Sequence, residues 1–160
     1  MANTQSMCTS FLGELLSATH NFSSANPAQT ASTANVFKAA LYLASSTLNA
    51  STTSYATATT EVSGTGYTAG GVTVTNATNP TATNSSTTAG VGYWTPSASF
   101  VYTTVTLTTA FDCVLIYNST NGGKAVSVHT FGSQTVTAGT FTLTMPSNTT
   151  STALLRLATT

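Results

Sequence analysis

Few side chains in this chain of 160 residues could carry out acid–base chemistry. The sequence holds three basic residues, three acidic residues and two histidines, and its formal net charge is zero. His20 and His129 have the ordinary pKa that would let them act as bases near neutral pH. His129 and Asp112 could nominally join a serine in a Ser–His–Asp triad. With 20 serines such a combination is expected by chance, and the sequence contains no Gly-x-Ser-x-Gly elbow.

The position of His129 also argues against catalysis. In the run VSVHTF, residues 126–131, alternation places Val126, Val128 and Thr130 on one face and His129 on the other. This pattern predicts a solvent-facing histidine on a strand, which is a more ordinary role than that of a general base.

Metal and cofactor chemistry have equally little support. The possible soft-metal ligands lack the short paired spacings of zinc sites; they are Cys8, His20, Cys113 and His129. The three carboxylates are too scattered for a calcium site or a glycosidase pair; they are Glu14, Glu61 and Asp112. The glycine-rich residues 64–71 lack the spacing and lysine of a phosphate loop. We therefore expect no catalytic residue, metal or cofactor. An enzyme is the weakest alternative, and it would require His129 or Asp112 to titrate abnormally in a cleft.

Composition points instead to an assembly protein. The sequence contains 38 threonines and 20 serines, whereas only 4% of its residues are charged. Three scattered cations, Lys38, Lys124 and Arg156, cannot form a surface for nucleic acid or an anionic membrane. A surface that repels its own copies so little suits a protein packed against itself or a large partner. Because we find no apolar span and no signal-peptide pattern, we expect either folding in the cytosol or export by some other route.

The elements that must position these residues begin with a short helix predicted over residues 9–19, which Thr9 or Ser10 would cap. An apolar stripe at i, i+4 spacing runs along it, formed by Phe11, Leu12, Leu15 and Leu16. This stripe could cover the end of the protein's own sandwich or anchor it to a partner. On the anchor hypothesis, removing residues 1–22 should abolish association and leave a folded sandwich.

The remainder of the chain predicts strands. Residues 111–118 read as a central strand because they are almost continuously apolar, and Asn121-Gly122-Gly123 predicts a hairpin. A second hairpin is expected around Ala138-Gly139. Further strands are expected at 36–44, 72–74, 100–111, 124–131, 134–137, 141–145 and 153–158. This pattern predicts an all-β fold, a single antiparallel β-sandwich of immunoglobulin-like or jelly-roll type, over residues 36–160, preceded by an arm with a short helix over residues 1–35.

Aromatic residues add to the candidate interface. Tyr93 and Trp94 precede Thr95-Pro96 at the edge of an expected strand, where they could form a sugar platform, an interface hot spot or, more commonly, core. The candidate interface residues are Phe11, Leu12, Leu15, Leu16, Phe22, Tyr93 and Trp94. Cys8 and Cys113 are expected to stay unpaired, because buried cysteine is usually a small hydrophobe.

Several segments together resemble small virion proteins of tailed bacteriophages. The opening pattern F-x-x-x-L-L-x-x-x-H-x-F is formed here by Phe11, Leu15, Leu16, His20 and Phe22. It is followed by FKAALY (37–42), EVSGTGYTAGG (61–71), AVSVHTFG (125–132) and GTFTLTMP (139–146). The resemblance covers most of the chain, and its motifs are structural rather than catalytic.

The resemblance implies a structural role on the virion, within which we expect a capsid cement or decoration protein that binds the outer shell at capsomer junctions. Its partners would be the major capsid protein and copies of itself, in a dimer or trimer, without nucleic acid or membrane. It would be made in the host bacterial cytoplasm and reside on the capsid surface. A tail, neck or fibre component is one alternative. A carbohydrate-binding or adhesive β-sandwich is another, and it requires an exposed Trp94 and Tyr93.

Overall fold

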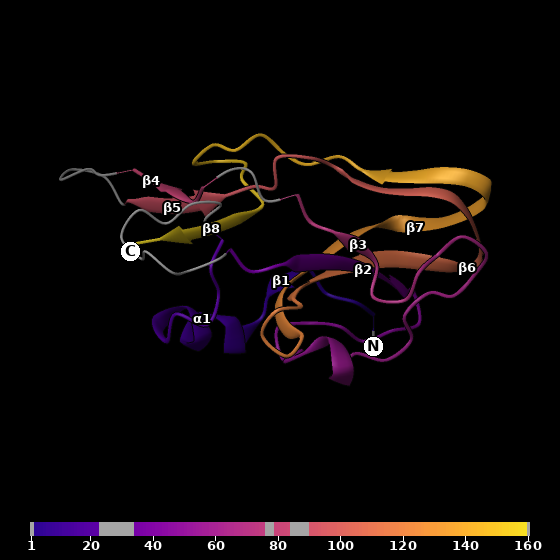
Figure 1. Ribbon diagram of the computed structural model, residues 1–160, viewed down its shortest axis with the longest axis horizontal. Coiled ribbons are helices and arrows are strands. Elements are labelled where there is room, and N and C mark those ends of the chain that lie inside the picture. The colour runs from indigo at the N-terminus through magenta and orange to yellow at the C-terminus, as the bar shows by residue number, and fades with distance from the viewer. Residues whose placement is uncertain (1, 23–33, 76–78, 84–89, 160) are drawn as a thin grey trace. The chain divides into compact units, whose positions relative to one another are not determined.

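The computed structural model describes residues 2–22, 34–75, 79–83 and 90–159 (Figure 1). Its strands form two antiparallel sheets, one of five strands in the order β1-β7-β6-β2-β3 and one of three in the order β4-β5-β8. With one short α-helix near the N-terminus, this arrangement confirms the predicted all-β fold class. The elements are β1 (Ser6–Met7), α1 (Thr9–Leu16), β2 (Phe37–Leu43), the 3-10 helix η1 (Tyr55–Thr57), β3 (Val72–Thr73), β4 (Thr81–Ala82), β5 (Val91–Trp94), β6 (Phe100–Asn118), β7 (Lys124–Leu143) and β8 (Leu155–Ala158).

The chain divides into two compact units, each assembled from separate segments. Unit 1 contains Met1–His20, Asn35–Val74 and Phe100–Thr142, and it holds the five-stranded sheet and α1. Unit 2 contains Asn21–Ala34, Thr75–Ser99 and Leu143–Thr160, and it holds the three-stranded sheet. No helix in the described ranges has the length and apolar character needed to cross a bilayer.

The core of unit 1 is built on β2 and the second half of β6. These two segments pair over their length from Phe37 opposite Asn118 to Leu43 opposite Phe111. Residues 111–118 are almost entirely buried, as their apolar run predicts. The alternation predicted for 36–44 is wrong as a guide to exposure, because both faces of β2 are covered. Phe37, Ala39, Ala40, Leu41 and Tyr42 are all fully buried.

The hairpin between β6 and β7 has the turn that the sequence predicts. Gly122 and Gly123 adopt φ values of 65° and 70°, which glycine tolerates without a Cβ clash. The second predicted hairpin, at Ala138-Gly139, is wrong. β7 continues through these residues, with Ala138 at φ 48° as a local irregularity. The Ala138 amide donates to Thr106 Oγ1 of β6 at 3.0 Å, which holds the ribbon together at this point.

The long β6–β7 ribbon folds back over its own sheet. In a straight strand, Phe131 and Phe141 would lie about 33 Å apart, yet their ring centroids are separated by 5.4 Å. Phe141 also contacts Phe111 edge-on at 4.9 Å. Figure 1 shows the ribbon turning over beyond the label of β6. The outer half of the ribbon therefore forms a second layer within unit 1, with aromatic rings filling the space between the two layers.

Unit 2 has a small core of its own. Trp94, at the end of β5, is buried and lies 4.7 Å from the ring of Phe22. β5 pairs with β8 from Val91 opposite Ala158 to Trp94 opposite Leu155. The Thr95 hydroxyl accepts a hydrogen bond from the Leu154 amide at 2.9 Å, which fastens the segment before β8 to this sheet.

Candidate functional site

Helix α1 is shorter than its sequence pattern predicts. It begins at Thr9, and its N-cap is Cys8, whose extended backbone provides no side-chain cap. The expectation that Thr9 or Ser10 caps the helix is wrong, because both lie within the first turn. The helix ends at Leu16, and Ala18 follows at φ 55°, a left-handed conformation that stops helix propagation.

The apolar stripe of α1 is divided between the core and solvent. Phe11 is buried against the His20 ring at 4.9 Å, and Leu15 is half-buried. Leu12 and Leu16 point outward, with 46% and 92% of their surfaces exposed. One turn apart on the helix, these two leucines form an exposed apolar pair, which we call the leucine pair. The stripe therefore serves partly as core, and the leucine pair is the part that remains available to a partner.

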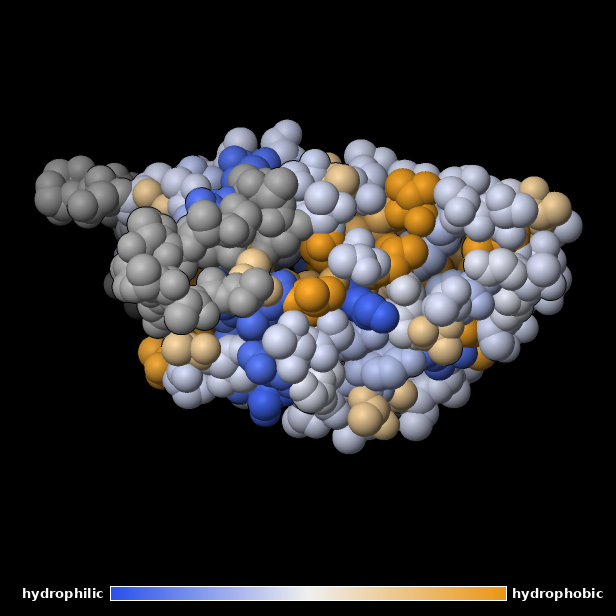
Figure 2. Space-filling model, viewed as in Figure 1, coloured by the Kyte–Doolittle hydropathy of each residue, from blue (hydrophilic) through white to orange (hydrophobic). Residues whose placement is uncertain are grey.

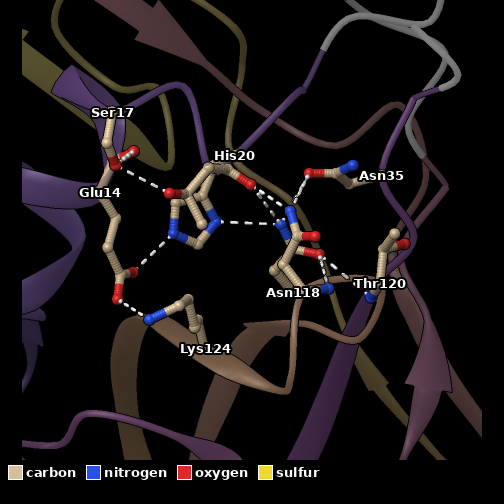
Figure 3. A network of polar contacts seen from close by, with 9 residues as sticks. Glu14, Ser17, His20, Asn35, Asn118, Thr120 and Lys124 are labelled. Atoms are coloured by element: carbon tan, nitrogen blue, oxygen red, sulfur yellow. Dashed lines mark hydrogen bonds and ion pairs between the residues drawn. The ribbon is translucent and has the colours of Figure 1, made fainter.

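A polar network holds α1 against the sheet (Figure 3). The Glu14 carboxylate accepts a hydrogen bond from Lys124 Nζ at 2.8 Å through one oxygen and lies 2.8 Å from His20 Nε2 through the other. Asn118 Nδ2 lies 3.2 Å from His20 Nδ1. Because an amide nitrogen can only donate, Nδ1 accepts, and Nε2 carries the proton that is donated to Glu14. The Glu14 carboxylate thus joins α1 to β7, and the buried His20 imidazole joins Glu14 to β6.

Asn118 extends this network at the end of β6. Its Nδ2 donates to Asn35 Oδ1 at 2.8 Å, and its Oδ1 accepts from the amides of Thr120 and Asn121 at 3.1 and 3.2 Å. Asn121 also donates to the Thr19 carbonyl. The side chain of Asn118 therefore organises the β6–β7 turn as well as the chain that leaves α1.

The pKa shifts of His20 and Glu14 indicate that this network stabilises the fold rather than carries out acid–base chemistry. Burial lowers the pKa of His20, and the nearby Glu14 carboxylate only partly opposes that effect. Burial raises the pKa of Glu14, but hydrogen bonds and charge from Lys124 and His20 outweigh it, so the net shift is downward. At neutral pH, a neutral imidazole and a charged carboxylate result. Since both ring nitrogens of His20 are occupied and the residue is buried, it is not placed to transfer a proton to a substrate.

A second polar cluster surrounds Glu61. Its carboxylate accepts hydrogen bonds from Tyr55 Oη at 2.6 Å, from Tyr67 Oη at 2.7 Å and from the Gly70 amide at 2.7 Å. Tyr117 stacks on Tyr55 at 4.6 Å and donates to the Gly70 carbonyl at 2.8 Å. Burial, together with the Glu61 charge, raises the pKa of Tyr117 to about 12. The phenols therefore remain protonated donors across the physiological range.

The glycines of residues 61–71 bring this loop against the sheet backbone. A Cβ on Gly71, which has φ 72°, would lie 1.8 Å from the Ala39 carbonyl oxygen. A Cβ on Gly64 would lie 2.1 Å from that of Thr106. The Glu61 carboxylate accepts the hydrogen bond of the Gly70 amide and so closes the loop. This amide is therefore not free to bind a phosphate. Glu61 was not predicted from the sequence to be an anchor, although it stands at the head of a motif that contains glycines and a tyrosine.

His129 departs from the predicted solvent-facing position. It is half-buried, its Nε2 lies 2.9 Å from Ser127 Oγ, and burial lowers its pKa to about 4. β1 pairs with the neighbouring residues of β7, placing Ser6 opposite Val128 and Met7 opposite Ser127. Ser127 is only 1% exposed, so a substrate cannot reach its hydroxyl in this conformation. The Ser127–His129 pair is therefore a buried hydrogen bond rather than an accessible nucleophile and base.

The other predicted chemical residues are also buried or held within the protein. Cys8 and Cys113 are free thiols, and burial raises the pKa of each to about 12. Asp112 accepts a hydrogen bond from Asn3 Nδ2 at 2.6 Å. Among the described residues, no three His, Cys, Asp or Glu side chains gather closely enough to hold a metal ion.

The aromatic candidates lie in the core of unit 2. Trp94 is 3% exposed and Phe22 is 7% exposed, whereas Tyr93 is half-buried. These residues belong to unit 2, whereas α1 belongs to unit 1. Because Trp94 packs on Phe22 inside the unit, the exposed Trp94 that a sugar platform requires is not available.

The surface of unit 1 has small hollows, and the larger of the two described here is lined mostly by hydroxyl side chains. One of about 250 Å³ is lined by Thr47, Leu48, Ser51, Thr52, Thr53, Thr57, Ala58 and Thr59. Another of about 210 Å³ lies where Tyr67 and Val72 approach Val101 and Val105. Neither is lined by a histidine, cysteine or carboxylate. In Figure 2 most of the coloured face lies near the middle of the hydropathy scale, as threonine and serine dictate.

Comparisons with known proteins leave the family open. No protein-family model, curated protein or solved structure matches the chain. The functional argument therefore rests on the residues and on their geometry.

Proposed function

We propose that the protein is a structural component of a tailed-bacteriophage virion, of the capsid cement type, which binds the outer shell and stabilises capsomer junctions. The proposal joins the resemblance of its motifs to one structural observation. That observation is the leucine pair, Leu12 and Leu16, exposed on a helix that a buried polar network fixes in place.

The use of charge within the chain supports an assembly role. The Glu14 carboxylate bonds to Lys124 and His20. The Glu61 carboxylate accepts hydrogen bonds from Tyr55, Tyr67 and the Gly70 amide. These two carboxylates thus stabilise the fold itself, and the groups available to contact a partner are mainly apolar side chains and hydroxyls. An interface of this composition needs no matching charges on a shell.

The leucine pair gives the proposed anchor an energetic basis. Burying a leucine side chain fully contributes about 1.5–3 kcal/mol relative to leaving it exposed. Nearly the whole surface of Leu16 and about half of that of Leu12 are exposed and could be buried against a partner. Such a contact is modest for one copy, but multivalent attachment raises the effective affinity without new kinds of contact. A symmetric shell with many equivalent positions provides that condition.

The position of the protein in the particle can be measured directly. Quantitative mass spectrometry of purified particles should give a copy number equal to that of the major shell protein or a simple fraction of it. A handful of copies would instead assign the protein to the tail or neck. Absence from particles would overturn the virion proposal altogether.

The anchor is tested separately by a double substitution, Leu12→Ser with Leu16→Ser. We expect this variant to remain folded, because both side chains are exposed, and to lose binding to shells that lack the protein. Leu157→Ser is the matched control, since Leu157 is 43% exposed in unit 2 and far from α1 in sequence. Normal decoration by the double variant would refute the leucine pair as the anchor.

A further inference from the structure

The outer half of β7 has one edge that no described strand covers. β6 lies on one side of β7 along the ribbon. On the other side β1 pairs only with Ser127 and Val128, and the Cys8 amide donates to the Val126 carbonyl at 3.0 Å. Among the described residues, no strand continues this pairing beyond Val128 towards the outer half of β7.

Residues 132–137, GSQTVT, lie on this uncovered edge, before the irregularity at Ala138. Six residues of strand span about 20 Å, and alternate residues direct both N–H and C=O away from β6. Gln134 Nε2 donates to the Gly132 carbonyl at 3.0 Å, so its own side chain holds one acceptor. Five of the six residues are exposed, and Val136 is half-buried.

The usual protections of a strand edge are missing from this run. Natural edges are blunted by lysine, by proline, by inward-pointing charges or by a covering element. Residues 132–137 contain neither a charge nor a proline, and the same holds for the whole outer stretch from Thr130 to Leu143. Only the irregularity at Ala138 interrupts it. An edge of this kind is a template for another strand.

We propose that a second copy of this chain occupies the edge, pairing Gly132–Thr137 of two protomers antiparallel about a two-fold axis. An antiparallel strand edge is self-complementary, as the isologous interface of a two-fold dimer requires. No like charges would meet, because the run is uncharged. At its inner end the same edge already accepts an antiparallel strand, β1, from its own chain. The result is a sheet continuous across the dimer.

The geometry also fixes which side chains share a face. A two-fold axis perpendicular to the sheet keeps the outward face of both copies on one side. Thr135 and Thr137 are exposed and two residues apart, so they share a face with their counterparts in the other protomer. Threonine pairs across antiparallel strands are favourable, whereas like charges placed opposite each other are destabilising.

Sedimentation velocity over a range of concentrations tests the proposal on the purified full chain. We expect the wild type to form dimers and the double variant Thr135→Lys with Thr137→Lys to weaken dimerisation at least tenfold. The matched control carries the same added charge on exposed loop threonines of unit 1, Thr59→Lys with Thr68→Lys, and should dimerise like the wild type. Near-UV circular dichroism verifies that each variant keeps its tertiary packing.

A monomeric wild type at about 100 μM would overturn the proposal, as would equal dimerisation of the edge variant or an equal loss in the control. Hydrogen exchange gives a second readout that does not depend on a variant. The amides of residues 132–137 that point away from β6 should lose protection when the wild type is diluted below its dissociation constant, and unchanged protection of these amides would contradict the edge pairing. Since neither measurement involves a capsid, their failure is distinguishable from failure of the cement proposal.

Discussion

Replacing Glu61 with alanine should destabilise unit 1 severely, because one carboxylate serves three donors. Tyr67 Oη and the Gly70 amide lose their acceptor inside the fold, whereas the Tyr55 hydroxyl can regain a partner from water. Each buried donor left unpaired costs about 1–3 kcal/mol. The two together give a loss of about 2–6 kcal/mol, which is a large part of the 5–15 kcal/mol that stabilises a typical domain.

Chemical denaturation followed by two optical signals would measure this loss. Five of the six tyrosines lie in unit 1, so near-UV circular dichroism of tyrosine reports mainly on that unit. The single tryptophan, Trp94, belongs to unit 2, and its fluorescence reports on the other sheet. We expect Glu61→Ala to lower the midpoint of the tyrosine transition in particular.

Two further variants make the reasoning refutable. Glu61→Gln keeps one carbonyl acceptor and should lose less than half as much stability as Glu61→Ala. Thr59→Ala changes an exposed loop residue and should stay within about 0.5 kcal/mol of the wild type. If Glu61→Ala costs less than about 1 kcal/mol, the cluster does not close the loop as described.

Three other outcomes follow from the buried groups. Burial lowers the pKa of His129 from 6.5 to about 4, so between these two pH values the unfolded chain binds a proton that the folded chain does not. The free energy of unfolding should therefore fall by up to about 3 kcal/mol as the pH drops through this window. Denaturation at a series of pH values should show this fall, and His129→Gln should remove most of the pH dependence. Gly71→Ala forces a Cβ against the Ala39 carbonyl at positive φ and should cost at least about 2 kcal/mol in the same denaturation assay; a loss below 0.5 kcal/mol would contradict the close approach. Cys8 and Cys113 should resist a thiol reagent in the native protein and react on unfolding, whereas rapid native labelling would show that the burial is only transient.

Local patterns predicted the parts of the fold that local physics determines. The apolar run at 111–118 identified the central strand, and Asn121-Gly122-Gly123 identified its hairpin, because positive φ there depends on the residues themselves. The same reasoning failed at Ala138-Gly139, where a similar turn signal lies inside β7. There the Ala138 amide bonds across to Thr106 of β6, which keeps this stretch paired within the ribbon, and Thr106 is 32 residues away in the sequence.

The candidate site was less predictable because exposure depends on what covers a face. Alternation assigned His129 to solvent, but β1 pairs across the edge of β7 next to it. Trp94 had two possible environments on sequence grounds, and only its packing on Phe22 decides between them. The stripe of α1 was correctly recognised as apolar, yet its division between Phe11 and the leucine pair depends on where the helix docks.

The division of α1 also changes how an anchoring role can be tested. Removing residues 1–22 was expected to leave a folded sandwich, but that deletion would take away β1, Phe11, His20 and the Glu14 carboxylate. Lys124 would lose its partner, and Ser127 would be uncovered. Loss of binding by such a truncation would therefore follow from damage to the sheet whether or not the helix touches a partner. Substitution of Leu12 and Leu16 removes only apolar surface that the fold does not use, so it separates recognition from stability.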